Sequence, residues 1–169
     1  MRELAVLLND MMRAGVVSDC ALFGATAQIR YTEPVATLDA DVLVAVPEPA
    51  RLDVLAPLYD FCATRGYHAE GEAIRVGSWP AQFIPVFSEL TREAVESAET
   101  ADFEGVPFRV VDAPHLAVIA LSVGRPKDFV RILALLESGA VTPDQIEELS
   151  TRHGLSEDWV RFRTRFLDA

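Results

Sequence analysis

Apolar residues recur along the chain at two spacings, and each spacing predicts a different kind of element. Between residues 2 and 14 they recur every three or four positions, which predicts a first helix. Short apolar runs at 20–23 and 41–46 predict two buried strands, with one or two helical turns at 25–31 between them. The chain is therefore expected to begin with a helix, a strand, a short helix and a second strand.

The middle of the chain predicts further strands, and the end predicts helices alone. We expect helices at 49–66 and 89–98, and short strands at 67–70, 73–76, 81–87, 101–104 and 107–111. From Pro114 onward the pattern is helical, with breaks near glycine and proline residues. These elements predict an α/β (α+β) fold. A small mixed β-sheet flanked by helices would occupy residues 1–112, and a helical C-terminal portion at 113–169 would pack on it within one continuous domain.

The composition is that of a globular domain without membrane-spanning or secretory features. Half of the 169 residues are hydrophobic, which is enough for one well-buried core. No apolar run approaches the roughly 20 residues that span a bilayer, and the N-terminus lacks a signal-peptide pattern. Cys20 and Cys62 lie among apolar residues without paired spacing. We therefore expect a soluble, cytoplasmic protein with no membrane partner and with buried free thiols.

The formal net charge of -11 argues against broad nucleic-acid binding, which depends on neutralising many phosphates with Lys and Arg. Residues 145–160 do have helix-turn-helix spacing, with Gly154 in the turn and Ser156 as the expected cap of the second helix. Glu157 and Asp158 at the start of that helix would repel DNA phosphates. A helical pair that packs on the core is therefore the favoured interpretation, and a DNA-binding regulator is the less favoured one.

Two acidic residues stand at the start of the second predicted strand. Asp39 and Asp41 are two positions apart and lead into an apolar run. On an extended strand their carboxylates point to one face, while Leu38 and Ala40 point to the other. Paired carboxylates suit Mg²⁺, which takes one or two of them and fills its remaining positions with water and substrate phosphates. The pattern indicates phosphoryl or nucleotidyl transfer, and the alternative interpretation is a solvated turn before a strand.

A glycine turn precedes the acid pair by about a dozen residues. Gly24-Ala25-Thr26 follows the first predicted strand and opens the short helix. Glycine lets the backbone approach a ligand closely, the amides at a helix start favour a phosphate, and the Thr26 hydroxyl could add a donor. The alternative interpretation is that Gly24 only ends a strand.

The glycine turn and the acid pair together resemble the nucleotidyltransferase fold of the DNA polymerase β superfamily. Within it, they resemble the small bacterial proteins related to the AbiEii toxin of toxin–antitoxin systems and to minimal nucleotidyltransferases. Gly24-Ala25-Thr26 matches the family's turn, with Ala25 in place of a second Gly or Ser, and Asp39-Ala40-Asp41 matches its metal-binding strand. A helical motif of the AbiEii-like proteins is similar to residues 120–128, which end in Arg125-Pro126-Lys127-Asp128.

The resemblance implies a transfer reaction and a role for each matching residue. It implies that Asp39 and Asp41 hold Mg²⁺, or Mn²⁺, and act in catalysis. It also implies that Gly24–Thr26 seats the phosphates of a nucleoside triphosphate, and that Lys127 and Arg125 neutralise the charge that develops on them. The acceptor would be a hydroxyl on a protein, an RNA or a small molecule.

Two departures from the family pattern leave a second function open. Gln82 stands where a third carboxylate is expected, and an amide could position the acceptor but cannot deprotonate an attacking hydroxyl. Ser122 replaces the first lysine of the helical motif. The chain is therefore either a nucleotidyltransferase or a noncatalytic nucleotide-binding or protein-interaction module on the same fold.

The only lysine of the chain, Lys127, also has two interpretations. On a helix that starts at Pro126 it lies four positions from Arg131, so the two cations could hold a triphosphate together. Alternatively, both are ordinary surface charges, with Asp128 paired to Arg131 or Arg125 at negligible energetic value.

Overall fold

The computed structural model describes residues 1–34, 36–47 and 53–168. The chain divides into two compact units, one made of Met1–Ala27 and Ala36–Val111 and the other made of Gln28–Val35 and Asp112–Ala169. The first unit holds a β-sheet with its helices, and the second is helical. The predicted α/β class, with a mixed sheet followed by a helical C-terminal portion, is confirmed.

The first unit is built on a mixed sheet that has seven strands among the described residues. The strands are β1 (Asp19–Phe23), β2 (Ala40–Ala45), β3 (Ala69–Glu70), β4 (Ala73–Val76), β5 (Trp79–Pro85), β6 (Glu99–Phe103) and β7 (Val106–Val110). Their order across the sheet is β3-β4-β5-β2-β1-β7-β6. β2 runs parallel to β5, β1 runs parallel to β7, and the other neighbours are antiparallel. β2 is therefore the central strand.

The apolar run of β2 explains its central position. Val42, Leu43 and Val44 have no exposed surface, so both faces of the strand are covered, as expected for a strand with a continuous hydrophobic run. Leu38 is 90% exposed, because β2 begins only at Ala40. The predicted alternation therefore does not extend back to Leu38 or to Asp39, which lies in a bend just before the strand.

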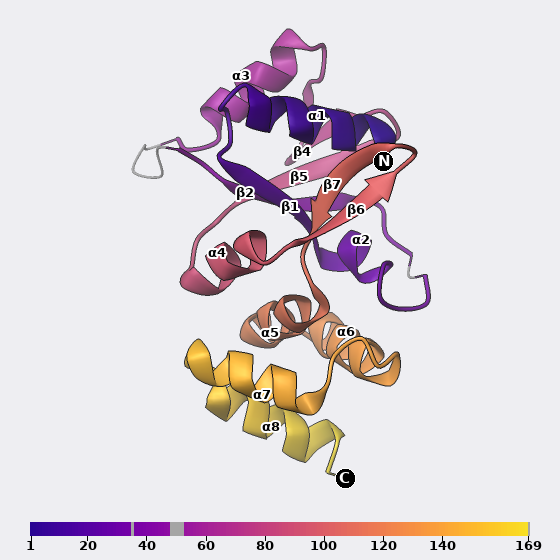
Figure 1. Ribbon diagram of the computed structural model, residues 1–169, viewed down its shortest axis with the longest axis vertical. Helices are drawn as coiled ribbons and strands as arrows, with labels where there is room; N and C mark the ends of the chain where they lie inside the picture. The colour runs from indigo at the N-terminus through magenta and orange to yellow at the C-terminus, as the bar shows by residue number, and fades with distance from the viewer. Residues whose placement is uncertain (35, 48–52, 169) are drawn as a thin grey trace. The chain divides into compact units, whose positions relative to one another are not determined.

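In the part of the chain that the structure describes, four helices accompany the sheet: α1 (Arg2–Arg13), α2 (Gly24–Gln28), α3 (Ala56–Thr64) and α4 (Glu89–Glu96). α1 and α3 lie on one face of the sheet, and α4 lies on the other (Figure 1). The apolar stripe of α1 is buried, as its helical spacing predicts. Arg65, at the end of α3, pairs with Asp10 of α1 at 3.7 Å, which joins the two helices at the surface.

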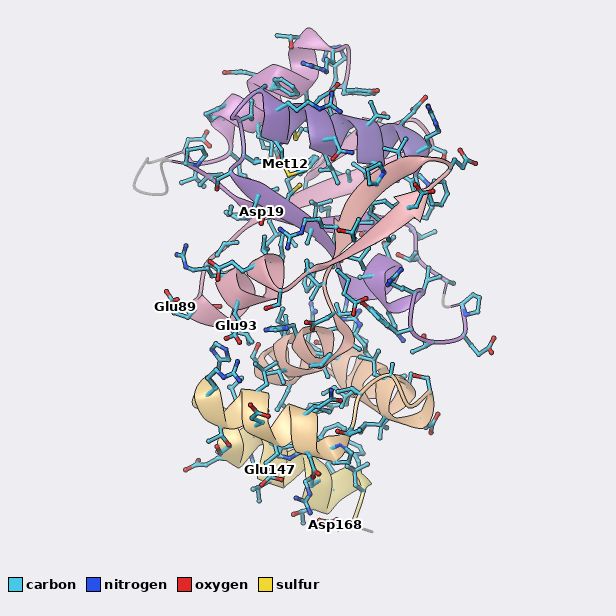
Figure 2. The ribbon with its side chains drawn as sticks, viewed as in Figure 1. Met12, Asp19, Glu89, Glu93, Glu147 and Asp168 are labelled. Atoms are coloured by element: carbon cyan, nitrogen blue, oxygen red, sulfur yellow. The ribbon has the colours of Figure 1, made fainter. Side chains whose placement is uncertain are left out.

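Arg109 ties three elements of the first unit together. Its guanidinium pairs with Asp19 at the start of β1, a residue labelled in Figure 2. It also donates to the backbone carbonyls of Glu96 at 3.0 Å and Ala98 at 3.1 Å, at the end of α4. Because these carbonyls lie at and beyond the last turn of a helix, the arginine satisfies acceptors that the helix leaves without a partner.

Both cysteines are free and buried, as predicted. Burial raises the pKa of the Cys20 thiol to about 12, and the neighbouring Asp19 carboxylate adds to the rise. Burial also raises the pKa of the Cys62 thiol to about 11. Both thiols are therefore protonated at neutral pH, which makes them poor nucleophiles and poor metal ligands.

The second unit consists of α5 (Ala113–Val123), α6 (Pro126–Glu137), α7 (Pro143–Arg152) and α8 (Ser156–Phe166), together with the segment 28–35. α5 is buried along most of its length and contacts each of the other three helices. Trp159 and Phe162 of α8 and Ile146 of α7 are buried, and both helices contact α5. The two helices therefore pack within the second unit, and the predicted packing of the helical portion on the sheet stays a prediction. Glu147, labelled in Figure 2, pairs with Arg163 across the two helices at 3.3 Å.

Helix boundaries differ from the predictions at several places, and the starts of α3 and α8 are two of them. The helix expected from residue 49 begins at Ala56 within the described part of the chain, and residues 48–52 lie outside it. The Asp53 carboxylate accepts from the backbone N–H of Leu55 and Ala56, at 3.2 and 3.0 Å, which forms a turn ahead of the helix. The predicted cap at Ser156 is wrong: Leu155 is the N-cap, and the Ser156 hydroxyl donates to Thr151 instead.

Other local predictions hold. Thr142 and Gln145 form the predicted capping box of α7, with hydrogen bonds of 2.9 and 3.3 Å between their side chains and each other's backbone N–H. Throughout the described ranges, every helix falls short of the length and apolarity that crossing a bilayer requires.

Candidate functional site

The glycine turn and the acid pair meet because β1 and β2 are antiparallel, so that β1 ends where β2 begins. The edge of the sheet formed by these strand ends carries the candidate site. Phe23, the last residue of β1, pairs with Asp41 near the start of β2. Gly24 follows with a φ of +70°. A Cβ at Gly24 would overlap Oδ2 of Asp41 and lie 3.2 Å from its Cγ. Position 24 therefore requires glycine for two reasons, the left-handed backbone and the carboxylate against it.

Asp39 is held at the same edge by two threonine hydroxyls. Thr26 of α2 donates to the backbone carbonyl oxygen of Asp39 at 2.9 Å. Thr37 donates to the same oxygen at 2.9 Å and lies 3.4 Å from Oδ1 of the Asp39 carboxylate. A hydroxyl has one hydrogen to donate, so the Thr26 hydrogen is engaged with Asp39. Its predicted role as a phosphate donor stays a prediction, and the contact that the structure shows is one that fixes the acidic residue.

Gln82 lies beside the two acids. In the parallel pairing of β2 and β5, Gln82 stands opposite Asp41, and residues paired in this way point to the same face. Its Nε2 lies 3.5 Å from Oδ2 of Asp39, a long hydrogen bond. Because a carboxylate only accepts, the end of the amide that faces Asp39 is the NH₂ group. The position expected for a third acid thus carries a neutral donor.

The donor atoms at this edge suit a small hard cation. Asp39 and Asp41 are half-buried and offer carboxylate oxygens, the ligand type that Mg²⁺ and Mn²⁺ prefer. Because glycine has no side chain, position 24 leaves space for the Asp41 carboxylate. The described residues contain no group of three or more His, Cys, Asp or Glu side chains that could hold a metal. The residues therefore fit a cation that takes two protein carboxylates and its remaining ligands from water or substrate.

The predicted phosphate-binding cations belong to the second unit. Lys127 is exposed on the first turn of α6. Arg125 is the N-cap of α6, and its guanidinium donates to Asp128 through Nε at 2.7 Å and Nη2 at 3.2 Å. Arg131 donates to Asp128 at 3.4 Å and to Oε1 of Gln28 at 3.2 Å. Arg131 thus takes part in a network with Asp128, and the roles of Lys127 and Arg125 toward a nucleotide stay predictions.

Asp128 is the centre of this network and is only 1% exposed. The pairing of Asp128 with Arg125 and Arg131, part of the alternative interpretation of Lys127, is confirmed. The part of that interpretation that makes Asp128 a surface charge is wrong, because its carboxylate is buried. A buried carboxylate must be paired, because an unpaired charge in a low-dielectric interior is strongly destabilising. The sequence could have indicated this, since Asp128 lies at a buried helical position one turn before Ile132.

The fold was compared with known proteins. By sequence, the chain matches no protein-family model and no curated protein. By structure, it is similar to an antigenic nucleotidyltransferase-like protein from Paracoccidioides brasiliensis, with a TM-score of 0.63 and 13% identity over 97% of this chain and 87% of that one. It is also similar to the antibiotic-resistance factor ANT(2'')-Ia, with a TM-score of 0.54 and 11% identity over 97% of both chains. This chain has a nucleotidyltransferase fold.

A third nucleotidyltransferase-fold neighbour is larger. The Megavirus polyadenylate synthase aligns with 82% of this chain and 31% of its own length, at 16% identity and a TM-score of 0.50. The nucleotidyltransferase fold predicted from the glycine turn and the acid pair is thus confirmed, while the AbiEii-type resemblance stays a prediction. Identities this low establish architecture and leave the activity to be argued from the site.

Replacing Gly24 tests its close approach to Asp41. We expect Gly24→Ala to weaken Mn²⁺ binding at least about tenfold, because the new Cβ displaces the Asp41 carboxylate. Gly15→Ala is the matched control, since Gly15 has a φ of +69° and no heavy atom within 4 Å of a Cβ built there. Both variants should lose about 1–2 kcal/mol of stability to backbone strain. Calorimetric Mn²⁺ titrations that give the two variants equal affinities would contradict this role of Gly24.

Replacing Asp128 tests whether its network is structural. We expect Asp128→Ala to lower the free energy of unfolding by about 3 kcal/mol, because it removes the buried carboxylate that pairs with Arg131, whose side chain is only 14% exposed. Asp158→Ala breaks an exposed pair with Arg161 and should cost less than about 1 kcal/mol. Urea unfolding measures both, and equal losses would show that Asp128 is no more than a surface charge.

Proposed function

We propose that the chain binds a nucleoside triphosphate through a divalent cation held by Asp39 and Asp41, and transfers its nucleotidyl group to an acceptor hydroxyl. The acceptor oxygen forms a bond to the α-phosphorus and loses its proton, and pyrophosphate leaves. The observation that supports this proposal is the meeting of two half-buried carboxylates with the Gly24 turn, in a fold shared with nucleotidyltransferases. Mg²⁺ is the expected cation, and Mn²⁺ could replace it.

Each residue at this edge has a separate task in the proposal. Asp39 and Asp41 bind the cation, which when bound supplies positive charge next to the triphosphate. Thr26 and Thr37 fix the backbone of Asp39 and so the direction of its carboxylate. Gly24 leaves Asp41 room to point at the same cation. The catalytic work of these residues is positioning and charge stabilisation, the two effects on which phosphoryl-group transfer mainly depends.

Gln82 can bind the acceptor but cannot serve as its base. Its amide can donate a hydrogen bond to an acceptor oxygen, whereas the proton of an acceptor hydroxyl must leave to solvent. The printed names of the neighbours include an antibiotic-resistance factor and a polyadenylate synthase, so the same fold serves different substrates. We keep a protein, an RNA and a small molecule as candidate acceptors.

A second function is favoured by the same residue. With Gln82 in contact with Asp39, the site has the means to bind a metal–nucleotide complex. Among the described residues it has no third carboxylate, beyond the two assigned to the cation, that would accept a proton. A noncatalytic nucleotide-binding module needs only the first of these properties.

Thermal stabilisation by nucleotides tests the binding step. With Mg²⁺ present, a saturating nucleoside triphosphate should raise the melting temperature by several degrees, because ligand at 100 times its dissociation constant adds about 2.7 kcal/mol and each kcal/mol is worth about 2–4 °C. We expect Asp39→Asn to abolish the shift and Asp60→Asn, at an exposed position on α3, to retain it. A shift that survives in Asp39→Asn would contradict the proposed site.

Transfer of an α-³²P-labelled nucleotide then separates the two functions. Label that becomes attached to protein, RNA or a small molecule in the wild type, and not in Asp39→Asn, supports a transferase. Stabilisation without any label transfer supports the binding module.

A further inference from the structure

We infer that this site, if it binds nucleotide as proposed, holds one divalent cation and that Gln82 sets this number. Asp39, Asp41 and Gln82 form the acidic cluster, in which Gln82 alone is neutral. Three properties of this cluster favour a single cation: its net charge, the direction of the Gln82 amide and the hydrogen bonds of Asp39.

The charge of the cluster matches one dication. Asp39 and Asp41 supply two negative charges, and Gln82 on the adjoining strand supplies none. The described residues add no third acid, histidine or cysteine that would complete a metal-binding group. Two dications held about 3.5–4 Å apart repel each other four times as strongly as two unit charges do at that separation. Two protein carboxylates balance the charge of one such ion, so a second ion would depend on the triphosphate alone for its negative charge.

The amide of Gln82 faces the acids with its donor end. Its Nε2 lies 3.5 Å from Oδ2 of Asp39, and an amide nitrogen has no lone pair with which to ligate a cation. The neighbours Ala81 and Phe83 are buried, so the alternation of β5 places Gln82 on the face opposite to theirs, the face of Asp41. A carboxylate at position 82 would offer acceptor oxygens at the same place.

The two oxygens of the Asp39 carboxylate differ in their surroundings. The single Thr37 hydrogen goes to the Asp39 backbone carbonyl at 2.9 Å, so its 3.4 Å approach to Oδ1 leaves that oxygen available to a cation. Oδ2 faces the Gln82 amide nitrogen at 3.5 Å. A second cation on Oδ2 would have to compete with this donor. The surroundings of Asp39 therefore favour a single ion.

Counting bound Mn²⁺ tests the inference directly. The full chain is saturated with α,β-methylene ATP, which cannot donate its nucleotidyl group, and Mn²⁺ retained after ultrafiltration is counted by electron paramagnetic resonance. We expect one Mn²⁺ per chain in the wild type and two in Gln82→Glu, because the new carboxylate supplies the missing charge. Gln82→Ala removes the donor without adding charge and should keep one Mn²⁺.

Gln145→Glu is the matched control, since it adds the same charge in the second unit, where glutamate preserves the capping box. It should bind one Mn²⁺. A melting curve without metal reports folding: Gln82→Glu should melt below the wild type, because it places a third carboxylate beside Asp39 and Asp41, and Mn²⁺ should remove the difference. If Gln82→Glu does not fold, Gln82→Asp is used in its place to measure the number of Mn²⁺ ions per chain.

Each outcome separates this inference from the proposed function. Two Mn²⁺ per wild-type chain would overturn the inference and leave the proposed function intact. One Mn²⁺ in both the wild type and the acidic variant would show that Gln82 does not set the number. A wild type that binds neither Mn²⁺ nor the nucleotide analogue would overturn the proposed function itself.

Discussion

The close approach of Gly24 to Asp41 is the constraint on which this edge of the sheet depends. The antiparallel register of β1 and β2 places Phe23 across from Asp41, so the next residue must pass against the Asp41 carboxylate. Glycine accepts both the left-handed backbone and the lack of space. The chain can then turn directly into α2, whose Thr26 reaches the Asp39 carbonyl. One backbone register thus gathers residues that are far apart in sequence.

The chemistry of the edge divides into charge and orientation. Asp39 and Asp41 provide the negative charge, while Thr26, Thr37 and Gln82 provide donors that hold Asp39. In the proposed function these donors orient Asp39 before a cation binds. The amide at position 82 cannot take a proton from an acceptor. The proposal therefore treats nucleotide binding and group transfer as separable properties.

Local sequence patterns predict β1, β2 and the glycine turn between them. Strand alternation does not determine the face of Asp39, because β2 begins only at Ala40. Asp39 is placed instead by hydrogen bonds with Thr26 and Gln82. Gln82, which the resemblance places near the acids, stands opposite Asp41. Other contacts join residues that are distant in sequence, and local patterns do not predict them. Nothing near Gln28 indicates that it accepts a hydrogen bond from Arg131, 103 residues away. The start of α3 was also missed, because a side-chain turn at Asp53 competes with helix formation.

Paramagnetic broadening by Mn²⁺ is the most direct measurement of the central claim, that Asp39 and Asp41 hold a cation beside Gly24. In ¹⁵N-labelled full-length protein with α,β-methylene ATP, substoichiometric Mn²⁺ should broaden the backbone amide signals of Gly24, Asp41 and Gln82 first. The same signals should stay sharp in Asp39→Asn. Unchanged intensities at these three amides, with broadening at other acidic positions of the first unit, would contradict the account.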